Sequence, residues 1–133
     1  MPDAYYKVSF GLVNGGVLSL LDDLKHISGL LVGGSSIFQT NNFDLEGSYI
    51  AFVEQCVATL GVSTITINPG YFEPIDLIIS ALMIEPSETI DADEVTCIIN
   101  SDGAQVAGFI CGQDIESVTI NASIGCEVIY CAT

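Results

Sequence analysis

Positive charge is nearly missing from this sequence. Its 133 residues include 17 Asp and Glu but only two basic residues, Lys7 and Lys25, so the formal net charge is −15 at pH 7. Nucleic-acid-binding proteins neutralise phosphates with Lys and Arg, and anionic membranes attract the same side chains. The composition therefore predicts that neither nucleic acid nor a membrane is a partner. Most carboxylates must instead be solvated, hydrogen-bonded, bound to cations or faced by a basic partner.

Residues for enzymatic chemistry are also scarce. His26 is the only histidine, and the chain has no Trp to form a sugar platform. With one His and no Arg, most general-base and phosphate-handling chemistries lack their side chains. The glycine-rich stretches 14–16 and 32–36 match no nucleotide-binding motif and are predicted to be turns. The sequence thus predicts no enzyme and no cofactor.

Cysteine spacing typical of metal sites is absent. The chain has five cysteines, with no C-x-x-C pair: Cys56, Cys97, Cys111, Cys126 and Cys131. An odd number at these spacings favours small buried thiols over a disulfide framework or a metal cluster.

Long apolar runs are missing too. No stretch approaches the ~18 residues that span a bilayer, and the first seven residues lack the basic and apolar regions of a secretory signal. Half of the residues are nonetheless apolar, and 133 residues suffice for a buried core. We therefore expect one β-rich domain over residues 1–133, synthesised in the cytoplasm.

Alternating apolar residues predict several strands. Residues 4–13 and 62–67 show this pattern, and 75–84 is continuous enough for a buried strand or a short helix. Residues 17–27 fit either a helix face or a strand returning from the turn at 14–16. The start of that segment favours a strand, and the rest stays open.

One segment has helical spacing. Tyr49, Phe52, Cys56 and Leu60 recur at intervals of three and four, and Gly61 follows the last apolar residue. Residues 48–60 are predicted to be an amphipathic helix packed on a sheet.

The C-terminal third reads as short strands at 94–99, 104–111, 117–123 and 126–132. A turn at 100–103 suggests a hairpin that would place Cys97 opposite Val106. Thr-Ile-Asn occurs at 66–68 and again at 119–121, which we interpret as shared β chemistry and not as a repeat. The predicted fold is mainly β (α+β): a single-domain antiparallel β-sandwich or partly closed barrel, with the 48–60 helix packed on it.

An acidic loop is the strongest candidate for a metal site. Glu88, Asp91, Asp93 and Glu94 could supply oxygen ligands to Ca²⁺, although their spacing differs from that of an EF-hand. The alternative is a solvated surface loop.

These features favour a structural assembly subunit. It would form homo-oligomers and bind a larger protein scaffold such as a capsid, which suggests a virion or another extracellular assembly. A phage capsid decoration (cement) protein is the class we favour, by analogy of size, β content and acidity. The alternatives are a phage tail-tube-type subunit and a small acidic module that binds a cation or ligand.

Overall fold

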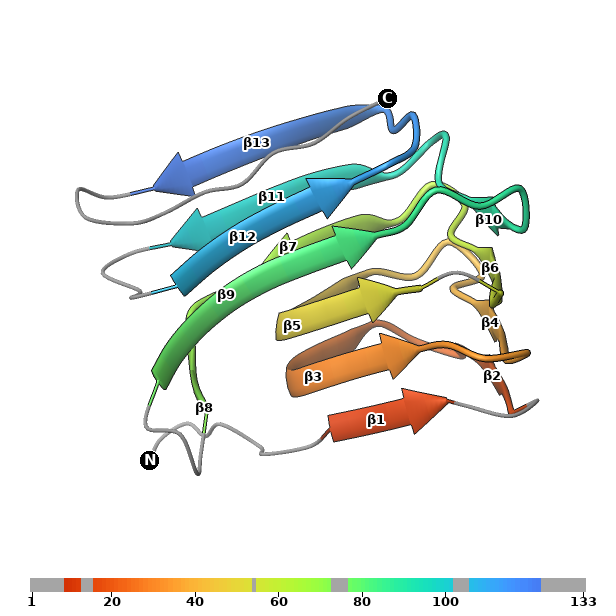
Figure 1. Ribbon diagram of the computed structural model, residues 1–133, viewed down its shortest axis with the longest axis horizontal. Helices are drawn as coiled ribbons and strands as arrows, with labels where there is room; N and C mark the ends of the chain where they lie inside the picture. Colours follow the sequence, from red (N-terminus) through yellow and green to blue (C-terminus); the bar gives the residue numbers. More distant parts are fainter. Residues whose placement is uncertain (1–8, 13–15, 54, 73–76, 102–105, 123–133) are drawn as a thin grey trace.

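The computed structural model describes residues 9–12, 16–53, 55–72, 77–101 and 106–122 (Figure 1). Every regular element in these segments is a β-strand. No helix among these residues is long and apolar enough to cross a membrane.

The strands form two sheets. Sheet A holds nine: β1 (Ser9–Leu12), β3 (Leu24–Val32), β5 (Leu45–Phe52), β7 (Thr64–Ile67), β8 (Gly70–Phe72), β9 (Leu77–Ile84), β11 (Thr96–Ser101), β12 (Val106–Cys111) and β13 (Ser117–Ala122). Sheet B holds four: β2 (Val17–Ser19), β4 (Ile37–Gln39), β6 (Val57–Thr59) and β10 (Ile90–Asp91).

The pairing is parallel, and it follows a regular spacing in the first coils. Ile37 pairs with Val57, and Leu45 pairs with Ile65, so neighbouring strands from β1 to β7 are about 20 residues apart. From β1 to β6 the chain alternates between the two sheets, and each coil stacks on the one before it (Figure 1). This arrangement is a parallel β-solenoid. The exception is β8, which pairs with β9 antiparallel.

The fourth coil, which runs from β7 to β10, is larger than the three before it. The first half of β5 pairs with β7, whereas its second half pairs with β9. Sheet A therefore continues as two ladders, β7–β11–β13 and β9–β12 (Figure 1).

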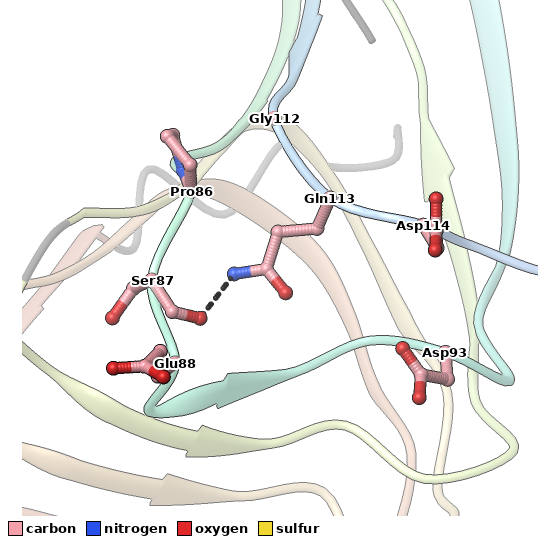
Figure 2. A pocket seen from close by; sticks show the side chains of 7 residues that line it. All are labelled: Pro86, Ser87, Glu88, Asp93, Gly112, Gln113 and Asp114. Atoms are coloured by element: carbon pink, nitrogen blue, oxygen red, sulfur yellow. Dashed lines mark hydrogen bonds between the residues drawn. The ribbon is translucent and has the colours of Figure 1, made fainter. Parts of the chain in front are cut away.

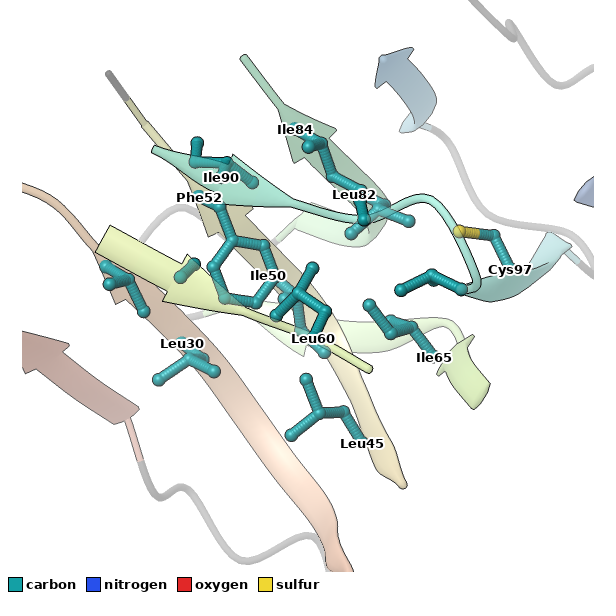
Figure 3. Packing of buried hydrophobic residues seen from close by; sticks show 14 of the residues in the cluster. Leu30, Leu45, Ile50, Phe52, Leu60, Ile65, Leu82, Ile84, Ile90 and Cys97 are labelled. Carbon is teal, nitrogen blue, oxygen red and sulfur yellow. The ribbon is translucent and has the colours of Figure 1, made fainter. Parts of the chain in front are cut away.

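The core is built from side-chain columns that run across the coils. Registered strands place like positions above one another, such as Leu30, Ile50, Leu82 and Phe109 in one buried column. From sheet B, Phe38 meets Phe52 with ring centroids 5.5 Å apart. Figure 3 shows residues from both sheets meeting in a single apolar interior. Burying these side chains is the main stabilising contribution to the fold.

The predicted antiparallel sandwich or partly closed barrel is wrong. The predicted hairpin is also wrong, because β11 pairs with β7 and β13, while β12 pairs with β9. Cys97 lies opposite Ile65 and Val118, not opposite Val106. Alternation shows which side chains face inward, but it does not say whether the partner strand is a sequence neighbour or lies a full coil away.

The predicted helix at 48–60 is wrong as well. Of its described residues, 48–52 belong to β5 and 57–59 to β6, and Gln55 between them lies in a turn. Phe52, Cys56 and Leu60 are buried as the helical pattern required, but Val57, which the predicted helix would place on the same apolar face, is 42% exposed. A strand, a corner and a second strand can bury every fourth residue across a bend, which imitates one helix face. Gln55 has φ of 77°, a left-handed value incompatible with a continuous helix.

The structure decides the two segments that the sequence left open. Residues 17–19 form β2 and 24–27 begin β3, with a bend at 21–22 between them, and 75–84 contains strand β9. The predicted strand at 4–13 is represented by β1, and the rest of it lies outside the described residues, as does the predicted strand at 126–132.

Repetition is the largest feature that sequence reasoning missed. The two Thr-Ile-Asn triplets occupy equivalent positions on the two neighbours of β11, since Ile67 and Ile120 both pair with Ile99. The chain therefore does repeat structurally, although the repeated positions share side-chain type more than identity.

Candidate functional site

Sheet B exposes a column of apolar side chains. Val17, Ile37 and Val57 stand in register on β2, β4 and β6, with exposed fractions of 64%, 36% and 42%. Two residues further along each strand, Ser19, Gln39 and Thr59 form a parallel polar column. We call these six outward residues the B face.

The B face carries no charge. Its six side chains are aliphatic, hydroxyl or amide groups, although the whole chain has a net charge of −15. The hydroxyl of Ser19 donates to the Gln39 side chain at 3.3 Å. A flat, uncharged, partly apolar surface on so acidic a protein is suited to contact with another macromolecule.

An open cavity lies at the other end of sheet B. Its volume is about 510 Å³, and it is lined by Pro86, Ser87, Glu88, Asp93, Gly112, Gln113 and Asp114 (Figure 2). Three of these seven residues carry a carboxylate. The side-chain nitrogen of Gln113 donates to the carbonyls of Glu85 at 3.0 Å and Ser87 at 2.8 Å, which ties two coils together at this place.

The four predicted metal ligands are all exposed, but only two of them line this cavity. Glu88 and Asp93 do so together with Asp114, whereas Asp91 and Glu94 are not among the lining residues. The backbone N–H of Asp93 donates to the Asp91 carboxylate at 3.4 Å. No group of three or more His, Cys, Asp or Glu side chains in the described segments is arranged to hold a metal ion. Calcium binding by these four residues stays a prediction.

A chain of polar side chains crosses four coils. The side-chain nitrogen of Asn121 donates to Asn100 at 2.9 Å, that of Asn100 donates to Asn68 at 2.8 Å, and that of Asn68 donates to Glu46 at 2.9 Å. We call Asn68, Asn100 and Asn121 the asparagine ladder, and Glu46 accepts the hydrogen bond at one end of it. Each amide can donate to one neighbour and accept from the next, so stacked asparagines satisfy one another along the ladder.

His26 lies beside the last member of this chain. Its Nδ1 atom is 3.7 Å from the Glu46 carboxylate, and its side chain is 70% exposed. The backbone of His26 has φ of 60°, at the point where the register between β3 and β5 slips by a residue. This position is a β-bulge on the surface.

The described cysteines are core residues. Cys56, Cys97 and Cys111 are free and buried, as predicted for them, while Cys126 and Cys131 lie outside the described residues. Burial raises the pKa of the Cys97 thiol to about 12, with a smaller effect from Cys111. Such thiols are protonated at neutral pH and are poor nucleophiles.

A smaller cavity of about 270 Å³ borders the B face. It is lined by uncharged residues at a corner shared by two coils: Gln39, Thr40, Asn41, Asn42, Thr59 and Gly61. Several of its polar groups are already engaged, because Asn41 donates to the Leu20 carbonyl and Asn42 accepts from the Val62 N–H. This corner is stabilised by its own hydrogen bonds.

Comparison with protein families, with curated proteins and with solved structures found no match. The candidate site therefore depends on its geometry. Sequence reasoning missed the B face because its residues are 20 apart, and because Val17 lay in the segment left open between helix and strand while Val57 lay in the predicted helix at 48–60. Aligning the sequence on that spacing would have brought Val17, Ile37 and Val57 together.

Proposed function

We propose that the protein is an assembly subunit that associates with further copies of itself through the B face. The observation that carries the proposal is the exposed, registered column of Val17, Ile37 and Val57. Contact through this column would remove apolar surface from water, which favours association. The function is binding and not catalysis. Its placement in a phage virion stays an expectation from composition.

Charge supports a second copy as the occupant. Two chains of net charge −15 repel each other, and they can approach closely only where carboxylates are absent. The strands β2, β4 and β6 carry no acidic residue, whereas β10 at the end of the same sheet carries Asp91. The B face thus permits a self-complementary contact of two flat sheet surfaces.

The size of the B face predicts a weak contact. Three strands of three residues make a small patch, well below the roughly 800 Å² per partner of a stable interface. Salt should strengthen the association, because it screens the repulsion between the acidic surfaces without weakening the apolar contact.

Sedimentation velocity over a rising concentration series, at low and at physiological salt, tests the proposal. We expect reversible self-association that increases with protein concentration and with salt. Ile37→Glu should abolish it, because this change puts a carboxylate in the centre of the B face.

Ile110→Glu is the matched control. Ile110 has the same 36% exposure as Ile37 but lies on β12 in sheet A. This variant should associate as the unchanged chain does. A chain that stays monomeric under all conditions, or equal loss of association in both variants, would rule out the B face as the contact.

A further inference from the structure

Hydroxyl side chains form a regular array on the outer face of β7, β11 and β13. These strands lie side by side in register, because Thr96 pairs with Thr64 on one side and with Ser117 on the other (Figure 1). Alternate residues such as Ile65 and Cys97 are fully buried, so the positions between them face outward. We call six of these outward positions the hydroxyl grid: Thr64, Thr66, Thr96, Ile98, Ser117 and Thr119.

The hydroxyl grid is uncharged, and its polar groups are left to water. Five of its six side chains carry a hydroxyl, and none of these hydroxyls has a hydrogen-bond partner among the described residues. The asparagine ladder borders the grid on the same three strands, but its amides bond to one another. On the β5 side the next position is Glu46, which accepts from Asn68. Each grid hydroxyl can both donate a hydrogen bond to water and accept one from it.

The spacing of the grid follows from the geometry of the sheet. Neighbouring strands lie about 4.8 Å apart, and outward positions on one strand lie about 6.7 Å apart. Threonine is branched at Cβ, which restricts its χ1 angle and fixes the positions of its hydroxyl and methyl groups. Backbone pairing on both sides of β11 holds the central row in place. Waters bound to the grid therefore repeat in two directions, at distances close to those between oxygen atoms on the faces of ice crystals.

We propose that the hydroxyl grid binds the surface of ice. The waters held by its hydroxyls join the crystal lattice, and the threonine methyl groups lie against the crystal and leave the liquid. The absence of charge favours this occupant, because an ionic group would have to give up its hydration shell at the crystal surface. A polysaccharide fits less well, since none of the six side chains is aromatic and a sugar ring has nothing to stack on. The grid shares no residue with the B face.

Freezing of single small droplets in a nanolitre osmometer, with the full chain in solution, tests the proposal. We expect the freezing temperature to fall below the melting temperature of the same ice crystal, with a gap that widens as protein concentration rises. Ordinary solutes lower both temperatures together, so the gap reports adsorption to ice. The chain should also become enriched in ice grown slowly from a dilute solution, whereas an added globular protein of similar size should be excluded from it.

Two variants and a matched control locate the site. Thr96→Tyr and Thr119→Tyr each raise a ring above the grid, so the crystal can no longer approach and the gap should be lost. Tyr is favoured in strands, and Thr119 is exposed, so the second variant should unfold at the same temperature as the unchanged chain. Ile110→Tyr adds the same ring to an outward position of β12, which carries no grid residue, and should leave the gap unchanged.

Three results would overturn the proposal. The first is an unchanged chain that shows neither the gap nor enrichment in ice. The second is a gap that persists in Thr119→Tyr or is lost equally in Ile110→Tyr. The third is binding to crystalline cellulose without adsorption to ice, which would assign the grid to a polysaccharide.

Discussion

The outer face of sheet B and the asparagine ladder are both columns of stacked side chains, but they use the coil spacing differently. In the ladder, Asn68, Asn100 and Asn121 bond to one another, so their hydrogen-bonding capacity is directed along the solenoid. On the B face, Val17, Ile37 and Val57 can offer only apolar contact, and a large part of each side chain remains exposed. Stacking similar residues therefore gives internal register when the groups are polar and directional, and a contact surface when they are apolar.

The inward columns differ from both. Val32, Phe52, Ile84 and Cys111 occupy one buried column, although their sizes differ widely. Because interior volume is shared among columns from both sheets, a large residue in one can compensate for a small one in another. This freedom explains why the repeat is poorly visible in the sequence.

The largest expected effect is a loss of stability that differs between the buried and the exposed side of β4. Phe38→Ala should lower the free energy of unfolding by about 3–5 kcal/mol, because Phe38 is fully buried and its loss leaves a cavity. Ile37→Ala, one residue away on the B face, should cost less than about 1 kcal/mol. Urea denaturation of both variants measures the difference. Similar losses would mean that Ile37 contributes to the core and that the B face is not an independent surface.

A smaller effect is expected in the asparagine ladder. Asn100→Ala should cost about 2 kcal/mol, because it removes two side-chain hydrogen bonds and leaves the side-chain oxygen of part-buried Asn68 without its donor. Asn121→Ala removes one bond from an exposed residue and should cost less than half as much. Thermal unfolding of the two variants compares them. If the Asn121 variant were equally destabilised, the ladder would not depend on its central member.

The smallest effect concerns two buried hydroxyls beside sheet B. The hydroxyl of Thr40 donates to the Leu60 carbonyl at 2.7 Å, but that of Ser36 has no hydrogen-bond partner among the described residues. Ser36→Ala should therefore raise the free energy of unfolding by up to about 1 kcal/mol, while Thr40→Val should lower it by about 1–2 kcal/mol. The same urea titrations measure both. A destabilised Ser36→Ala variant would indicate that this hydroxyl does have a partner.

The sequence predicted several strands but not their partners. Residues 64–67 were recognisable as a strand because β-branched residues are concentrated there, whereas 77–84 lay in a segment left open between a strand and a short helix. Their partners were not, since alternation is a local signal and parallel pairing joins residues a coil apart. Thr64 pairs with Thr96, which lies 32 residues further along the chain, whereas the spacing in the first coils is 20 residues. These 12 extra residues further obscured the period.

The candidate sites were predictable only in part. The sequence placed Glu88 and Asp93 in an acidic cluster, and both residues line a cavity. Asp114 and Gln113 were not associated with them, because only the stacked coils bring residues 112–114 beside 86–88. The uncharged B face had no local signature at all.

The 20-residue spacing also bears on how the chain acquires its structure. In the first coils, a strand's partner lies only one coil earlier in the sequence, as Leu30 with Ile50 shows. Short separations cost little loop-closure entropy, and in solenoids each unit contacts only its neighbours. A nascent chain could therefore add each new coil to the preceding one during synthesis, with the finished coil acting as the template. The wider gap between β7 and β11 would be the place where this stepwise growth pauses.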